Sequence, residues 1–185
     1  MIYLSTEKLK FGYDSVIGTP VDLQFSAGEI LQIKGSNGSG KSTLLKTLLG
    51  EVSKQSGKID WKIPSVDISY LPQTSMTSQN FNFTLGEFLN IYDVDQEIRQ
   101  HLRPNLVDKP WVNSSGGEKQ LALILTRITK RTKVLILDEP LNHLDTSSRS
   151  LVENLIKDLM KQKRDLSLII VSHLNINLPM REIVI

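Results

Sequence analysis

Residues 35–42 read GSNGSGKS, and their spacing, G-x-x-x-x-G-K-[ST], is typical of loops that bind the phosphates of a nucleotide. The apolar segment EILQIK precedes the loop and the helical pattern KSTLLKTLLGE follows it, which is the context that the motif requires. Glycines let consecutive backbone N–H groups converge on phosphate oxygens, and the start of the helix adds positive potential. The residues expected to contact the nucleotide are Gly35, Ser36, Asn37, Gly38, Ser39, Gly40, Lys41, Ser42 and Thr43.

Two side chains of this loop have distinct expected roles. Lys41 is expected to reach the β- and γ-phosphates, and the Ser42 hydroxyl to ligate Mg²⁺. The alternative is a glycine-rich turn in which lysine and serine occur by coincidence. The flanking strand and helix argue against that alternative.

An acidic pair, Asp138 and Glu139, ends the nearly continuous apolar segment KVLILDEP. Such a segment is typical of a strand buried on both faces, and hence of a parallel sheet. Ligands of open α/β sheets bind at the carboxyl ends of the strands. We therefore expect Asp138 to hold Mg²⁺ through a water molecule, and Glu139 to face the γ-phosphate and polarise an attacking water.

Two further glycines, Gly116 and Gly117, open the helical pattern SSGGEKQLALIL. Glycine costs about 1 kcal/mol relative to alanine inside a helix, so a pair at a helix start calls for a reason. One reason is close approach of bare backbone to another group.

Strand and helix patterns alternate at both ends of the chain around a helical insert, which predicts an α/β fold. Short strands are expected within residues 2–33. Further strands are expected at 57–63, 65–73, 133–140, 167–173 and 181–185, and helices at 41–51, 84–92, 94–102, 117–128 and 146–163.

The amino-acid composition gives little indication of the cellular compartment or of the binding partners. The 185 residues include no cysteine, and a net charge of +2 does not by itself argue for nucleic acid or lipid. No apolar stretch approaches the roughly 20 residues of a bilayer crossing, and the N-terminus lacks the apolar core of a signal peptide. We expect a cytosolic chain, with any membrane crossing made by another chain.

With GSNGSGKST, SSGGE and LILDEP in this order, the chain resembles the nucleotide-binding domain of the ATP-binding cassette (ABC) family over nearly its whole length. The resemblance implies a P-loop NTPase (RecA-like) core with an N-terminal antiparallel β subdomain and an inserted helical subdomain. Residues 1–185 would form one ATPase domain. About 1–73 and 134–185 would be the core with its β subdomain, and about 74–133 the helical subdomain.

The resemblance also implies roles that spacing alone does not provide. Gln73 matches a glutamine that touches Mg²⁺ and senses the γ-phosphate, and His173 matches a switch histidine at the γ-phosphate. Tyr13 matches the aromatic residue that stacks on adenine, with Phe11 as the alternative. Asp145, in NHLD, matches a loop at the dimer interface, and it is equally suited to cap the helix that follows.

In the family two cassettes pack head to tail around two ATP molecules. The resemblance therefore implies that Ser115, Gly116 and Gly117 bind the γ-phosphate of ATP held by the partner. Three positions depart from the family pattern: Ser114 replaces a leucine, Glu118 a glutamine and Leu121 an arginine.

The function implied first is the Mg²⁺-dependent ATPase subunit of a membrane transporter. It would dimerise with itself or with a related cassette, and drive a separate permease from the cytoplasmic face of the membrane, without a nucleic-acid partner. A soluble protein of the F subfamily, acting on ribosomes, is the alternative that NHLD and SGGEK favour, but here there is one cassette and no charged linker. The third candidate function is a module that binds ATP with little turnover, which the departures at Ser114, Glu118 and Leu121 favour.

Overall fold

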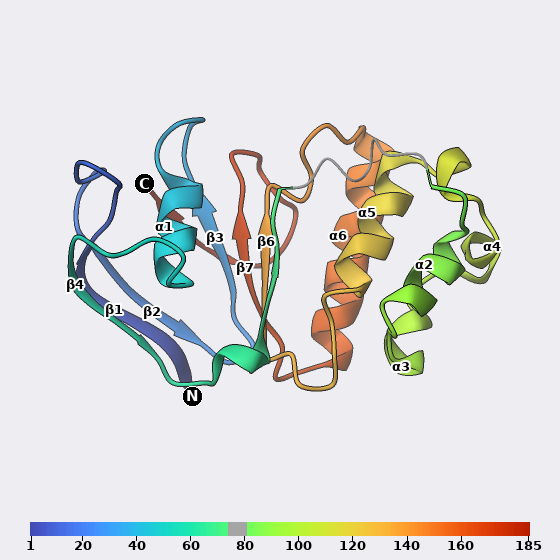
Figure 1. Ribbon diagram of the computed structural model, residues 1–185, viewed down its shortest axis with the longest axis horizontal. Helices are drawn as coiled ribbons and strands as arrows, with labels where there is room; N and C mark the ends of the chain where they lie inside the picture. The colour runs from blue at the N-terminus through green and yellow to red at the C-terminus, as the bar shows by residue number, and fades with distance from the viewer. Residues whose placement is uncertain (74–80) are drawn as a thin grey trace.

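A five-stranded parallel sheet forms the centre of the fold in the computed structural model, which describes residues 1–73 and 81–185 (Figure 1). The strand order is β5-β6-β7-β3-β8. The strands are β3 (Ile30–Lys34), β5 (Ile68–Leu71), β6 (Val134–Asp138), β7 (Ser167–Val171) and β8 (Arg181–Val184). Every residue of β6 and β7 is buried, so both faces of the sheet are covered there. The predicted α/β class and parallel sheet are confirmed.

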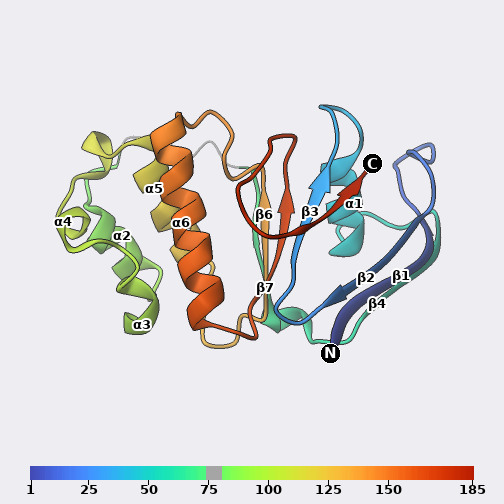
Figure 2. The same ribbon diagram turned by 180° about the vertical axis from the view of Figure 1, so that it is seen from behind.

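A three-stranded antiparallel sheet of order β2-β1-β4 stands at one end of the molecule (Figure 2). Its strands are β1 (Ile2–Lys10), β2 (Val21–Ser26) and β4 (Ser56–Trp61). Helix α1 (Lys41–Leu48) lies between the two sheets, and its leucines join one apolar core with residues of both. The chain leaves α1 at Gly50, whose φ of 78° stops the helix.

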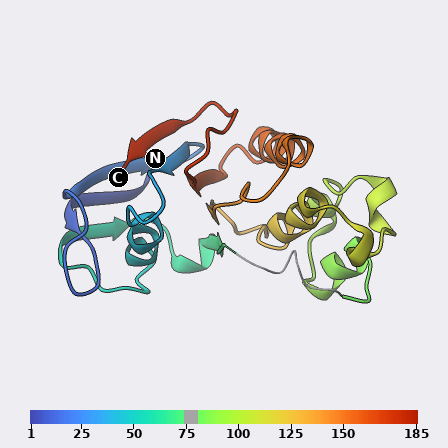
Figure 3. The ribbon, with the colours of Figure 1, turned by 90° about the horizontal axis from the view of Figure 1, so that it is seen from above.

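The other helices lie beyond the opposite face of the parallel sheet (Figure 3). Helices α5 (Gly116–Leu125) and α6 (Thr146–Gln162) pack against each other and share a second core with that face. Farther out lie α2 (Leu85–Ile91), α3 (Gln96–Arg99) and α4 (Pro104–Val107). Among residues 1–73 and 81–185, no helix has the length and apolar character needed to cross a membrane.

Several predicted boundaries are wrong. The helix expected at 94–102 is only Gln96–Arg99, and Pro104 begins a separate short helix, where its missing N–H costs nothing. The strand expected at 65–73 is Ile68–Leu71, preceded by a 3₁₀ turn at Ser65–Asp67. Residues 74–80 of the predicted helical subdomain lie outside the described residues.

Candidate functional site

Four neighbouring strands deliver the predicted phosphate-binding, metal-binding and catalytic residues to one edge of the parallel sheet, whereas Tyr13 and residues 115–117 come from other parts of the chain. The phosphate loop follows β3, Gln73 follows β5, Asp138 ends β6, and His173 follows β7. All pairings among these strands are parallel, so their carboxyl ends meet at the same edge. This is the edge at which open α/β sheets bind ligands.

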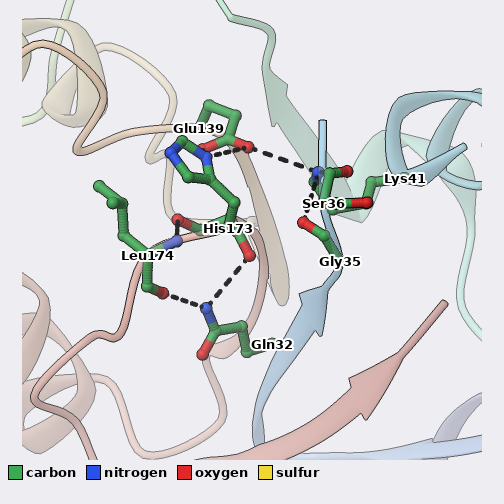
Figure 4. A network of polar contacts seen from close by, with 8 residues as sticks. Gln32, Gly35, Ser36, Lys41, Glu139, His173 and Leu174 are labelled. Carbon is green, nitrogen blue, oxygen red and sulfur yellow. Dashed lines mark hydrogen bonds and ion pairs between the residues drawn. The ribbon is translucent and has the colours of Figure 1, made fainter. Parts of the chain in front are cut away.

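The phosphate loop has the backbone that its glycines allow. Gly38 and Gly40 have φ of 84° and 97°, a region that side chains disfavour. A Cβ on Gly40 would lie 2.6 Å from the Ile17 side chain. The Lys41 side chain is 6% exposed, and its ammonium donates to the carbonyl oxygens of Gly35 at 2.9 Å and Ser36 at 2.8 Å (Figure 4). The Lys41 ammonium therefore lies against its own loop. When a nucleotide binds, phosphate oxygens can replace these carbonyls as its hydrogen-bond acceptors.

Glu139 lies between a cation and an imidazole. His173 Nδ1 is 3.1 Å from each Glu139 carboxylate oxygen, and Lys41 Nζ is 3.8 Å from Oε1 (Figure 4). The Glu139 N–H donates to the Val171 carbonyl at 2.8 Å, which joins the ends of β6 and β7. Glu139 has a φ of 49°, and strained backbone of this kind clusters at functional sites.

Asp138 has the environment of a cation ligand. Its side chain is buried, and Oδ1 has no hydrogen-bond partner among the residues that the structure describes. Burial raises the pKa of Asp138 and the nearby charge of Glu139 adds to the rise, whereas the Ser42 hydroxyl lowers it. A buried oxygen with no partner beside a serine hydroxyl fits Mg²⁺, which prefers oxygen ligands. Gln73, the third predicted ligand, is exposed.

Tyr70 also touches this centre, although the sequence analysis did not single it out. Its hydroxyl donates to Asp138 Oδ2 at 3.4 Å. Burial, followed by the charge of Asp138, raises the pKa of Tyr70, so the phenol keeps its proton for this contact. The parallel pairing of β5 with β6 creates the contact across 68 positions of sequence, and no local signal indicates it.

The two aromatic candidates for adenine stacking have opposite environments. Phe11 is 1% exposed and belongs to the core beneath Gly40, so neither face of its ring is open to a base. Tyr13 is 60% exposed. Gln55, another residue not anticipated, donates through Nε2 to the Tyr13 carbonyl at 2.6 Å and holds this loop. Exposure therefore favours Tyr13.

The SSGGE segment begins α5 with a capping box. The Ser115 hydroxyl accepts from the Glu118 N–H at 3.3 Å, and the Glu118 carboxylate accepts from the Ser115 N–H at 2.8 Å. Ser115 keeps its own hydroxyl proton for another acceptor. Burial raises the pKa of Glu118, but hydrogen bonds from Lys109 and Ser115 outweigh it and leave the pKa below its ordinary value.

The three departures from the family pattern have local structural explanations. Ser114 is buried and donates to the Pro110 carbonyl at 3.0 Å. Glu118 completes the capping box and pairs with Lys109 at 2.7 Å. Leu121 is 3% exposed within the core that α5 and α6 share. All three support the helix that carries Ser115.

Gly117 is required by packing within the chain. A Cβ added there would lie 2.6 Å from Ser148 Cβ and 2.8 Å from Ser148 Cα, so α5 and the start of α6 could not remain in place. At Gly116 the nearest atom would be Leu144 Cδ2, at 3.1 Å, the end of a flexible side chain. The close contact between α5 and α6 is therefore sufficient to explain why residue 117 is glycine. Packing does not require glycine at residue 116.

Gly117→Ala is expected to lower the free energy of unfolding by about 1–3 kcal/mol, because the added methyl group overpacks the contact with Ser148. Gly116→Ala is the matched control, with an expected change within about 0.5 kcal/mol. Denaturant unfolding of the nucleotide-free protein measures both. Equal stabilities of the two variants would contradict the packing explanation.

Asp145 caps α6, which is one of the two roles predicted for it, the other being at the dimer interface. Its Oδ1 accepts from the Ser148 N–H at 2.8 Å, and this bond, followed by one from the Ser147 hydroxyl, lowers the Asp145 pKa. His143, in the same loop, has a φ of 61°.

A family model described as "ABC transporter" matches residues 19–142, which contain the phosphate loop, the SSGGE segment and the acidic pair. The chain belongs to the ABC transporter family. Within it, this chain is an ATP-binding, ATP-hydrolysing transporter subunit.

Known proteins that are similar to the chain belong to transport systems. The zinc import ATP-binding protein ZnuC of Pseudomonas putida is 28% identical over 179 residues, which cover 94% of this chain and 68% of ZnuC. The structure of cbiO1 from Clostridium perfringens, part of the ABC transporter complex cbiONQ, superposes with a TM-score of 0.76 at 26% identity. That match covers 94% of this chain and 79% of cbiO1.

The ADP conformation of MJ1267, an ATP-binding cassette of an ABC transporter, has the same fold. Its TM-score is 0.77 at 20% identity, and the match covers 95% of this chain and 83% of MJ1267. The predicted fold class, a P-loop core with an antiparallel sheet and a helical insert, agrees with these structures.

Proposed function

We propose that this ATPase works as a head-to-tail dimer with two ATP sites, each built from the phosphate loop of one cassette and the SSGGE segment of the other. The observation that carries the hydrolytic part of the proposal is the position of Glu139, 3.1 Å from His173 and 3.8 Å from Lys41 at the carboxyl edge of the sheet. A carboxylate held between a phosphate-binding lysine and an imidazole is suited to activating water at the γ-phosphate. The shared site is supported by the resemblance of SSGGE to the family motif and by the exposure of Ser115 and Gly116.

The phosphate loop binds the nucleotide from one side. Its backbone N–H groups, residues 35–43, surround the phosphates, and Lys41 exchanges its carbonyl partners for phosphate oxygens. Tyr13 stacks on adenine. From the other cassette, the Ser115 hydroxyl and the N–H groups of Gly116 and Gly117 donate to the γ-phosphate.

Ser42, Gln73 and Asp138 would hold Mg²⁺, which when bound supplies charge neutralisation for the phosphates. The unpartnered Asp138 oxygen supports this assignment. Glu139 accepts the proton of the attacking water, and His173 orients Glu139 and the γ-phosphate.

Residues 1–185 act as one ATPase domain in this proposal, with 74–133 as the helical subdomain that meets a separate membrane permease. The cassette would then lie in the cytoplasm at the membrane surface. The membership of cbiO1 in a transporter complex supports a permease partner over the ribosome alternative. The intact pair of Glu139 and His173 favours hydrolysis over binding with little turnover.

A mixing experiment tests whether the sites are shared between two copies. Lys41→Ala inactivates the phosphate loop, whereas Ser115→Arg blocks the partner's site, so each variant alone should hydrolyse no ATP. In an equal mixture, half of the dimers contain one copy of each variant and one intact site, so about one quarter of the wild-type rate should return.

The same mixture separates the alternatives. Ser115→Arg should leave ATP affinity of the monomer unchanged, and a large loss would mean that Ser115 acts within its own chain. Recovery no greater than the sum of the two variants would exclude a homodimer with shared sites.

A pull-down from detergent-solubilised membranes, with ribosomes probed in parallel, tests whether the partner is a permease.

A further inference from the structure

Gln32 is a long polar side chain at the middle of β3, the strand that leads into the phosphate loop. It pairs with Ile170 of β7 on one side and Glu182 of β8 on the other, so its backbone is fixed by two neighbouring strands. Its side chain is 0% exposed, among strands whose residues are otherwise mostly apolar. A polar group at such a position normally has hydrogen bonds that justify its burial.

The amide of Gln32 binds the turn that carries His173. Gln32 Nε2 donates to the Leu174 carbonyl at 2.7 Å and lies 3.4 Å from the Ser172 carbonyl (Figure 4). These carbonyls flank His173 on either side along the chain. Two acceptors face the same atom, which identifies it as the NH₂ group and not the amide oxygen.

The turn has further ties to β3 and to itself. The Ser172 N–H donates to the Ile33 carbonyl at 3.1 Å, and the Leu174 N–H donates to the Ser172 hydroxyl at 3.0 Å. Residues 172–180 form no helix or strand, so these contacts and those of the Gln32 amide hold the turn in place of the regular bonds of an element. Of the side chains that the structure describes, the Gln32 amide is the one that donates to the Leu174 carbonyl, which lies beyond His173.

Stability alone does not explain this side chain. Gln32 Oε1 is buried and finds no hydrogen-bond donor within the described part of the chain. A buried acceptor without a donor costs free energy, and an apolar residue at this point of the core would avoid that cost. The benefit of glutamine is the placement of its NH₂ group against the His173 turn.

We propose that Gln32 is a positioning residue, which holds the His173 turn so that the imidazole stays against Glu139. It also connects this turn directly to the strand that ends in the phosphate loop, so nucleotide binding and the histidine share one rigid support. The inference rests on the proposed role of His173. The hydrogen bonds of Gln32 within the described residues go to the carbonyls of the turn and not to Glu139, so its action on Glu139 is through His173.

The decisive variant is Gln32→Met, which keeps the length of the side chain and removes the donor. With the turn released, the imidazole leaves its 3.1 Å position and kcat for ATP should fall about 10-fold, since small misplacements of catalytic groups are costly. KM for ATP should stay within about 2-fold, because the phosphate loop is untouched. Gln32→Met combined with His173→Ala should be no slower than His173→Ala alone.

Thr6→Val is the matched control. It removes the hydroxyl of a buried threonine, which donates to the Val21 carbonyl at 2.8 Å and accepts from the Leu23 N–H at 2.9 Å in the antiparallel sheet, and it should leave kcat unchanged. If Gln32→Met does not fold, Gln32→Leu removes the donor with a residue suited to the same apolar surroundings, and is measured in the same way.

A second measurement does not depend on activity. The chain has three histidines, so NMR of histidine-labelled protein resolves His101, His143 and His173 separately. Gln32→Met should shift or broaden the imidazole signals of His173 alone. Equal changes in all three would indicate general loosening and overturn the proposal, as would unchanged His173 signals.

The kinetic measurements distinguish a failure of the role proposed for His173 from a failure of the role proposed for Gln32. Wild-type kcat in His173→Ala would reject the role proposed for His173, while the NMR result would still decide whether Gln32 positions it. A slow His173→Ala together with a fast Gln32→Met, or additive losses in the double variant, would reject the role of Gln32 alone.

Discussion

Glu139→Gln is expected to lower kcat for ATP hydrolysis by about 10²- to 10⁴-fold, the range associated with loss of a general base. Glutamine has nearly the same shape as glutamate but cannot accept a proton from water. The amide can still lie between Lys41 and His173, so ATP affinity should be preserved. Because closure then proceeds without hydrolysis, ATP should trap a dimer that elutes earlier in gel filtration.

Glu7→Gln is the control for this experiment, since Glu7 is an exposed acid on β1 that pairs only with Lys58 among the ion pairs of the described residues. It should behave as wild type in both assays. A Glu139→Gln protein that hydrolyses ATP normally would remove Glu139 from the mechanism. One that is slow but never dimerises would retain Glu139 and reject the shared-site dimer.

Lys41→Ala is expected to weaken ATP binding by about 10- to 100-fold, as loss of a charge-assisted hydrogen bond of roughly 1.5–3 kcal/mol predicts. The ammonium is already held above the loop by the Gly35 and Ser36 carbonyls, so its position needs little rearrangement when phosphate arrives. Isothermal titration calorimetry measures the affinity, and hydrolysis should be lost in parallel.

Lys46→Ala, on the same helix, is the matched control and should bind ATP like the wild type. It removes an equal charge from the last turn of α1, away from the phosphate loop. Wild-type affinity in Lys41→Ala, or equal losses in the two variants, would contradict the assignment of the phosphate loop.

Much of the site could be predicted from the sequence because its motifs are local. The glycines that allow positive φ at Gly38 and Gly40, and the Asp145 cap, each depend on residues within a few positions. Alternating strand and helix patterns were likewise sufficient for the α/β class. The capping box of Ser115 and Glu118 is equally local, but it was not predicted, because Glu118 was considered only as a departure from the family pattern. The short helices α3 and α4 were less predictable, since four residues carry too little periodicity to set boundaries.

Other features were decided only by the tertiary structure. The choice between Phe11 and Tyr13 depends on which side chain the core covers, and the demand for Gly117 comes from Ser148 on another helix. The contacts of Gln32 with Leu174 and of Tyr70 with Asp138 span 142 and 68 positions. They exist because the sheet order, β5-β6-β7-β3, differs from chain order and sets distant segments side by side. Local residue types determine what each segment can do, whereas packing determines which segments meet.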